Sequence, residues 1–162
     1  MSDEKSLKYN EPWILQRADP YVYRHTDGSY YFTASVPAYD GIVLRRAGSL
    51  AELSGAEEVM IWKKHESGPM SYHIWAPEIH YLFGKWYIYF AGGEKEDIWK
   101  IRPYVLECSG DDPLTDEWVE LGKMKRAAED EFSFEAFSLD ATVFENKGEY
   151  LSLIHISEPT RL

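Results

Sequence analysis

Three similar openings recur along this chain of 162 residues, and their spacing constrains the fold more than any other feature. They read ADPYVY at 18–23, APEIHY at 76–81 and LDATVF at 139–144. Aligned by these letters, Asp19, Pro77 and Asp140 occupy the same place at nearly equal intervals. Each opening leads into a hairpin whose second strand is rich in aromatic residues. Repetition of this kind predicts the blades of a β-propeller.

The first opening shows how each unit is built. Residues 18–34 contain a run that alternates aromatic and polar residues, a polar turn at 25–28 and a second aromatic run at 30–32. The Asp27-Gly28 step within the turn is a strong hairpin signal, so the segment is predicted to be strand, turn and strand. Asp19 lies just before the first strand. A carboxylate at that position is either a turn cap or a catalytic group.

Further short strands are predicted along the rest of the chain, separated by Gly, Pro, Asn and Asp turn signals. They cover residues 42–47, 59–63, 79–82, 86–91, 102–109, 118–121, 141–144 and 149–151. Residues 48–58 are predicted to form a short helical turn or a loop. The pattern predicts an all-β chain with about two and a half propeller blades, and the alternative is an antiparallel sandwich that happens to repeat.

Composition and net charge limit the classes of molecule that the chain is expected to bind. Aromatic residues make up 15% of the chain, and their ring faces suit both β-structure and the apolar C–H side of a sugar. The net charge of −11 argues against nucleic acid or an anionic membrane surface as a partner. The sequence has no apolar run long enough to span a membrane. Its polar N-terminal segment lacks the apolar core of a signal peptide, which predicts a cytoplasmic protein.

The propeller prediction has a consequence for two carboxylates. The innermost strand of each blade delivers its first residues to the central axis, so Asp19 and Asp140 are expected to converge on one pocket. Hydrolysis of a glycoside by inversion needs one carboxylate to activate water and a second acid to protonate the leaving oxygen, roughly 6.5–9.5 Å apart. A further carboxylate nearby can tune the pKa of its neighbours.

Three motifs carry a resemblance to a known family. Ala18-Asp19-Pro20, HIWAPE at 73–78 and LDAT at 139–142 resemble the blade-leading motifs of glycoside hydrolase family 43. The sequences around the first two motifs are most similar to the exo-acting α-L-arabinofuranosidases of that family. The resemblance covers residues 9–150. It implies a five-bladed β-propeller and an inverting mechanism that needs no redox or organic cofactor.

The resemblance also assigns roles to the two aspartates. Asp19 matches the general base, and Asp140 matches the aspartate that tunes the pKa of the general acid and orients it. Ala141 follows Asp140 where the family commonly has proline. The family's general acid is a glutamate that leads the fourth blade, and the chain contains no such blade. We therefore expect a truncated enzyme, with residues 1–150 forming part of the catalytic propeller and little activity from the chain alone.

The last residues depart from the family. Residues 151–162 read LSLIHISEPTRL, which resembles the translation of a sequencing adapter, so a non-native tail is predicted there.

Trp75 is a candidate for sugar binding. Its indole could stack on a sugar in the central pocket or pack between blades, and both alternatives stay open. The histidines do not show a metal-binding spacing, so no metal site is predicted.

The predicted substrate is an oligosaccharide or polysaccharide, arabinan or arabinoxylan, from which terminal α-L-arabinofuranosyl units are released. Two alternatives remain from the sequence, a β-xylosidase of the same family and a non-catalytic carbohydrate-binding propeller.

Overall fold

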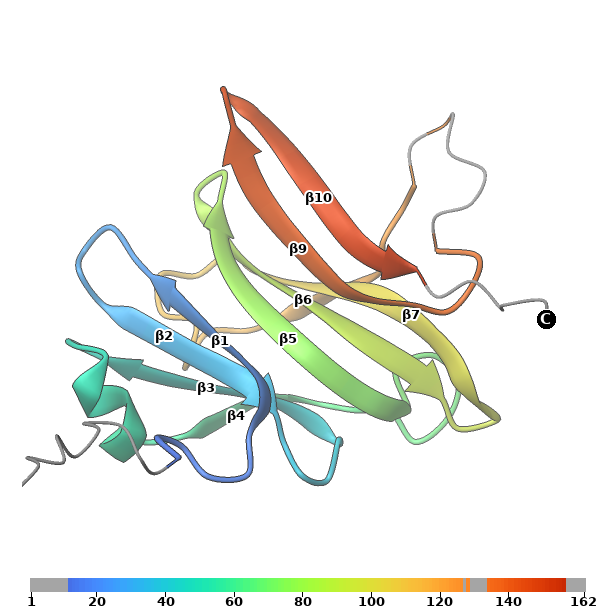
Figure 1. The fold of residues 1–162 in the computed structure, drawn as a ribbon, viewed down its shortest axis with the longest axis horizontal. Coiled ribbons are helices and arrows are strands. Elements are labelled where there is room, and N and C mark those ends of the chain that lie inside the picture. The colour runs from blue at the N-terminus through green and yellow to red at the C-terminus, as the bar shows by residue number, and fades with distance from the viewer. Residues whose placement is uncertain (1–11, 127, 129–133, 157–162) are drawn as a thin grey trace, which may run out of the picture.

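The computed structural model describes residues 12–126, 128 and 134–156, and within these residues the chain is built almost entirely of β-strands (Figure 1). The elements in chain order are β1 (Ala18–Arg24), β2 (Tyr30–Ser35), β3 (Gly41–Ala47), the 3₁₀ helix η1 (Ala51–Gly55), β4 (Val59–Lys63), β5 (Tyr72–Leu82), β6 (Lys85–Glu94), β7 (Asp97–Cys108), β8 (Val119–Lys123), β9 (Ser138–Asn146) and β10 (Glu149–Ile156).

These strands form two four-stranded antiparallel sheets and one hairpin. The sheet orders are β1-β2-β3-β4 and β5-β6-β7-β8, and β9 pairs with β10. The first strands β1, β5 and β9 run in the same direction, with β5 in contact with both others (Figure 1). The predicted blade pattern is confirmed: two blades and the first hairpin of a third lie side by side. The short helical turn expected at 48–58 is η1.

The main core lies where the two sheets face each other. On β6 the side chains of Trp86, Ile88 and Phe90 are buried, while the intervening tyrosines are only partly covered. This alternation is the period of two that a half-buried strand requires. The first sheet contributes Ile42 and Leu44, both with no exposed surface, to the same cluster. The aromatic WYIYFA run at 86–91 therefore packs at the interface between the two blades.

Strand β10 crosses residue 150, where the family resemblance was expected to end. It pairs with β9 in antiparallel register, with Tyr150 opposite Glu145 and Ser152 opposite Val143. Residues 157–162 lie outside the described part of the chain. The non-native origin of residues 151–162 stays a prediction, since strand pairing reports geometry and not the source of a sequence.

Candidate functional site

The same irregularity interrupts the first strand of all three blades. The strand pairing shifts between Ala18 and Tyr21 in β1, between Trp75 and Glu78 in β5, and between Leu139 and Thr142 in β9. One residue of each bulge has a left-handed backbone, with φ of 49° at Asp19, 45° at Ala76 and 54° at Asp140. A β-bulge bends the strand and re-aims a side chain. Aspartate adopts this backbone more readily than most residues, whereas alanine does so at a cost.

The positions of the bulges correct the alignment of the three openings that was made from the sequence. Asp19 is equivalent to Ala76, and not to Pro77 as the sequence comparison predicted, because Ala18 pairs across its hairpin as Trp75 does. The alignment by Ala18 and Ala76 was therefore wrong by one residue. Matching Pro20 with Pro77 would have found the observed register, since both prolines follow the left-handed residue.

Asp19 is tied to the second blade through Ser35. The Ser35 hydroxyl donates a hydrogen bond to Asp19 Oδ2 at 3.2 Å and accepts one from the Ala76 N–H at 2.8 Å. Ser35 is only 2% exposed, whereas the side chain of Asp19 is exposed, so the hydroxyl holds an open carboxylate from a buried position. The link holds the bulge of one blade against that of the next. Sequence reasoning missed Ser35, although the hairpin register places it opposite Ala18.

Asp140 occupies the equivalent bulge of β9, and its side chain is exposed. Within the described residues β1 and β9 each contact β5 but do not contact each other. The two aspartates therefore sit in matching positions of blades that flank β5, separated by the strand that carries Ala76.

Trp75 is half-buried beside rings from both blades. Its centroid lies 5.9 Å from that of Tyr39, which follows β2, and 4.3 Å from that of His73. The ring thus packs between blades and keeps part of its surface open. Packing and sugar contact are compatible for this residue.

Glu78 lies two residues beyond the left-handed Ala76 and contacts His80 at 3.2 Å. Burial, with Glu78 as a further cause, raises the pKa of Tyr21 to about 12. The Tyr21 hydroxyl therefore keeps its proton well above neutral pH and stays able to donate a hydrogen bond. Glu78 thus lies near Tyr21 of β1 and in contact with His80 of β5.

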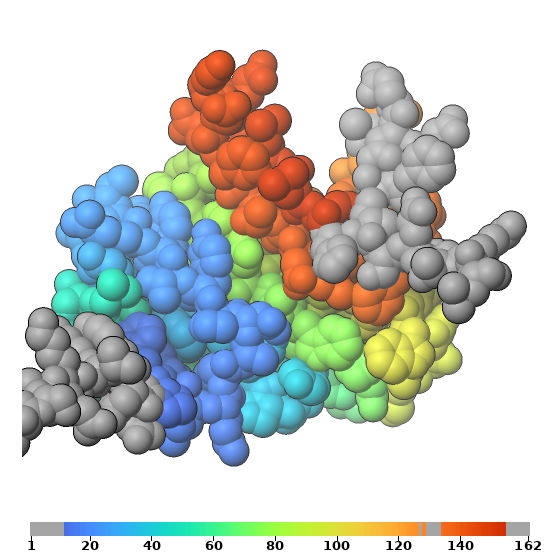
Figure 2. All heavy atoms as spheres, in the orientation of Figure 1, coloured from blue at the N-terminus to red at the C-terminus, as the bar shows by residue number. Residues whose placement is uncertain are grey.

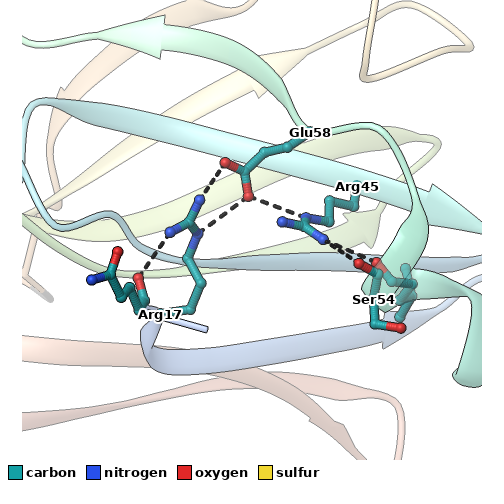
Figure 3. A network of polar contacts seen from close by, with 6 residues as sticks. Arg17, Arg45, Ser54 and Glu58 are labelled. Atoms are coloured by element: carbon teal, nitrogen blue, oxygen red, sulfur yellow. Dashed lines mark hydrogen bonds and ion pairs between the residues drawn. The ribbon is translucent and has the colours of Figure 1, made fainter. Parts of the chain in front are cut away.

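A brace of charged residues fixes the chain just before Asp19 (Figure 3). Arg17 and Arg45 both donate to the carboxylate of Glu58, with Nε–Oε2 distances of 3.2 and 3.1 Å. Burial acts to raise the pKa of Glu58, but the hydrogen bonds and charges of the two arginines outweigh it and hold that pKa below its usual value. Arg45 also donates to the carbonyl of Ser54 at 3.0 Å. The brace joins the entry to β1 with the η1 turn.

A hollow of about 540 Å³ opens beside this entry, lined by Arg17, Ala18, Ser35 and Tyr39 among others. The part of the chain that the structure describes holds no group of three or more His, Cys, Asp or Glu side chains placed to bind a metal. None of the described helices is long and apolar enough to cross a membrane.

The first and third blades thus carry aspartates at matching bulges of their first strands, and blades of this kind define a class of β-propeller. The sequence profile of glycosyl hydrolases family 43 matches residues 9–159. The chain belongs to this family.

Individual relatives of the chain are consistent with this family assignment. The chain is 52% identical over 140 residues to an extracellular exo-α-(1→5)-L-arabinofuranosidase of Streptomyces chartreusis, covering 86% of this chain and 41% of the relative. It is 45% identical over 156 residues to α-L-arabinofuranosidase 43 of Humicola insolens, covering 96% and 31%. The crystal structure of an α-L-arabinofuranosidase from Lactobacillus brevis matches with a TM-score of 0.80 and 46% identity, covering 92% of this chain and 47% of that one.

The chain thus spans less than half the length of these relatives. The comparisons also correct the expected location. The cytoplasmic prediction is wrong, because two Streptomyces relatives at 52% identity are named as extracellular enzymes. That prediction rested only on the first residues, which carry little weight in a chain that spans 41% of a relative.

Proposed function

We propose that this chain is the base-bearing part of an exo-acting glycoside hydrolase that removes terminal α-L-arabinofuranosyl units from arabinan or arabinoxylan oligosaccharides with inversion. One observation carries the proposal: the same left-handed bulge presents Asp19 in the first blade and Asp140 in the third. The printed names of the relatives support the choice of arabinofuranoside. They also support action outside the cell, where a polysaccharide is accessible.

In the proposed mechanism Asp19 accepts a proton from water as the water oxygen attacks the anomeric carbon. The bond from that carbon to the leaving oxygen breaks, and a general acid delivers a proton to this oxygen. By the family resemblance the acid is a glutamate of a later blade. Ser35 holds the Asp19 carboxylate in place, while Asp140 tunes and orients the acid. Trp75 offers a ring face to the sugar.

The negative surface fits a neutral sugar substrate, and the prediction of no nucleic-acid or membrane partner rests on charge alone. The residues of the site can act in this mechanism without a redox or organic cofactor, since every step is a proton transfer or a displacement.

The test is hydrolysis by the full-length gene product of aryl α-L-arabinofuranoside and aryl β-D-xyloside, with the first-formed sugar anomer followed by NMR. We expect release of arabinose as the inverted β-anomer and slower release of xylose. Preference for the xyloside would favour the β-xylosidase alternative. Binding without any hydrolysis would favour the non-catalytic module.

A further inference from the structure

Three aromatic side chains of the second blade form a continuous stack. The His73 ring lies between Trp75, at a centroid distance of 4.3 Å and an interplanar angle of 39°, and Trp99, at 5.5 Å and 33°. Trp75 and His73 come from β5, and Trp99 comes from β7. We call these three residues the aromatic stack. Its outer member, Trp99, is 62% exposed, so one end of the stack is open to ligand.

The backbone is distorted in order to build the stack. A register shift interrupts β5 between Tyr72 and Trp75, and His73 has a left-handed φ of 49°. A residue other than glycine in this region costs free energy, and such residues gather at functional sites. The distortion turns the ring of His73 toward Trp99 on the β6–β7 hairpin. In Figure 2 the start of β5, in green, and this hairpin, in yellow, lie together on the surface.

A buried serine fixes the two halves of the stack relative to each other. Ser71 has no exposed surface, and its N–H donates to the Gly93 carbonyl at 3.1 Å. Its hydroxyl accepts a bond from the Lys95 N–H at 2.8 Å and donates to the Gly68 carbonyl. These bonds clamp the start of β5 to the β6–β7 hairpin. A rigid, pre-formed aromatic surface loses little conformational entropy when it binds a ligand.

The chemistry of the stack suits a neutral, partly apolar ligand. Burial lowers the pKa of His73, so this imidazole is uncharged near neutral pH. The two indoles offer π-faces and N–H donors, which match the C–H faces and hydroxyls of a sugar ring. The stack also begins at the catalytic end of the blade, because Trp75 precedes Ala76, whose N–H is bonded to the Ser35 hydroxyl that reaches Asp19.

We propose that the aromatic stack is a subsite for the second sugar of the oligosaccharide, the unit next to the one that is released, with Trp99 as its outer contact. The inference rests on the proposed function. An enzyme that releases terminal units holds one sugar in its pocket, and the rest of the chain must leave along the surface. The stack leads from the pocket side at Trp75 to the solvent at Trp99.

The experiment titrates the full-length gene product, carrying Asp19→Asn so that the ligands are not hydrolysed, with methyl α-L-arabinofuranoside and with α-1,5-L-arabinotriose, following the indole N–H signals of Trp75 and Trp99 by NMR. We expect the trisaccharide to shift both signals and to bind more tightly than the monosaccharide. Trp99→Ala should weaken trisaccharide binding by about three- to tenfold and leave monosaccharide binding unchanged. Trp99→Phe should retain most of the gain.

Phe83→Ala is the matched control, since Phe83 is an aromatic residue 72% exposed at the other end of β5. It should leave both affinities unchanged. Equal affinity of the Asp19→Asn protein for the two ligands, or no effect of adding Trp99→Ala on the trisaccharide, would overturn the subsite and leave the proposed function standing. A folded full-length Asp19→Asn protein that binds neither ligand would count against both.

Discussion

The first and second blades begin with the same bulge but carry different side chains on its left-handed residue. Both open with a bulge whose left-handed residue precedes a proline, yet that residue is Asp19 in the first blade and Ala76 in the second. The third blade repeats the bulge with Asp140. The bulge is therefore a feature of blade architecture, and the carboxylate is an addition to it.

The comparison separates shape from chemistry. Alanine pays the cost of a left-handed backbone without contributing a functional group, which indicates that the bulge is needed for the strand to enter the blade. The N–H of Ala76 takes part in the site in another way, because it orients the Ser35 hydroxyl. The second blade thus supports the carboxylate of the first.

The largest expected effect comes from removing the carboxylate of the first bulge. In the full-length gene product Asp19→Asn should lower kcat by about 10²- to 10⁴-fold on an aryl arabinofuranoside, as loss of a general base does. Asp27→Asn is the matched control, since Asp27 caps the hairpin turn by accepting from the Ser29 N–H at 2.8 Å. Unchanged kcat in Asp19→Asn would make Asp19 a turn cap like Asp27.

The brace that positions the first bulge should show itself in stability. We expect Glu58→Gln to lower the free energy of unfolding at pH 7 by about 1–2 kcal/mol, because Arg17 and Arg45 lose a charged acceptor. The measurement is chemical denaturation at several pH values, with the exposed neighbour in Glu57→Gln as control.

The pH dependence has a definite sign. The folded-state pKa of Glu58 is lowered, so its contribution is complete above the unfolded-state value and is lost as the pH falls through the folded-state value. The stability difference between the native protein and Glu58→Gln should therefore shrink in acid. A stability difference that stays constant from pH 7 to pH 3 would contradict the claim that the ionised Glu58 carboxylate stabilises the fold.

A smaller effect is expected from the link between the blades. Ser35→Ala should cost about 1 kcal/mol of stability, because it leaves the Ala76 N–H without its acceptor in a buried site. Hydrogen exchange at the Ala76 amide should become faster. Ser54→Ala, which removes an exposed hydroxyl bonded to the Ala51 carbonyl, serves as control. Unchanged exchange at Ala76 in Ser35→Ala would show that the link is weak.

The smallest effect tests the strain at the second bulge. Ala76→Gly should raise stability by about 0.5 kcal/mol, since glycine adopts a φ of 45° freely and the gain is partly offset by unfolded-state entropy. Ala76→Val should be destabilising. Thermal denaturation measures both, and a more stable valine variant would contradict the strain.

Much of the fold could be predicted from local patterns. The strand predicted at 59–63 coincides with β4, and the first hairpin was predicted from the Asp27-Gly28 turn with its alternating flanks. Both depend on neighbouring residues alone. The strand predicted at 102–109 begins earlier, at Asp97, so the hairpin that carries Trp99 was missed.

The site was less predictable because its parts depend on pairing between strands. A bulge adds one unpaired residue to a strand, and no particular residue type marks its place in the sequence, so the equivalence of Asp19 and Ala76 was hidden. The role of Ser35 depends on a hydrogen bond from another blade. The matching positions of Asp19 and Asp140 could be predicted, because an aspartate at a repeated strand start is visible in the sequence, and their catalytic roles stay a proposal.

Chemical rescue tests the central claim most directly. In the full-length gene product, Asp19→Ala removes the group proposed to activate water, and azide is a nucleophile that needs no such activation. With an activated aryl α-L-arabinofuranoside we expect azide to restore turnover of Asp19→Ala and to yield the inverted β-arabinofuranosyl azide, while Asp140→Ala gives no such product. Absence of rescue in Asp19→Ala, or an azide product of retained configuration, would contradict the account.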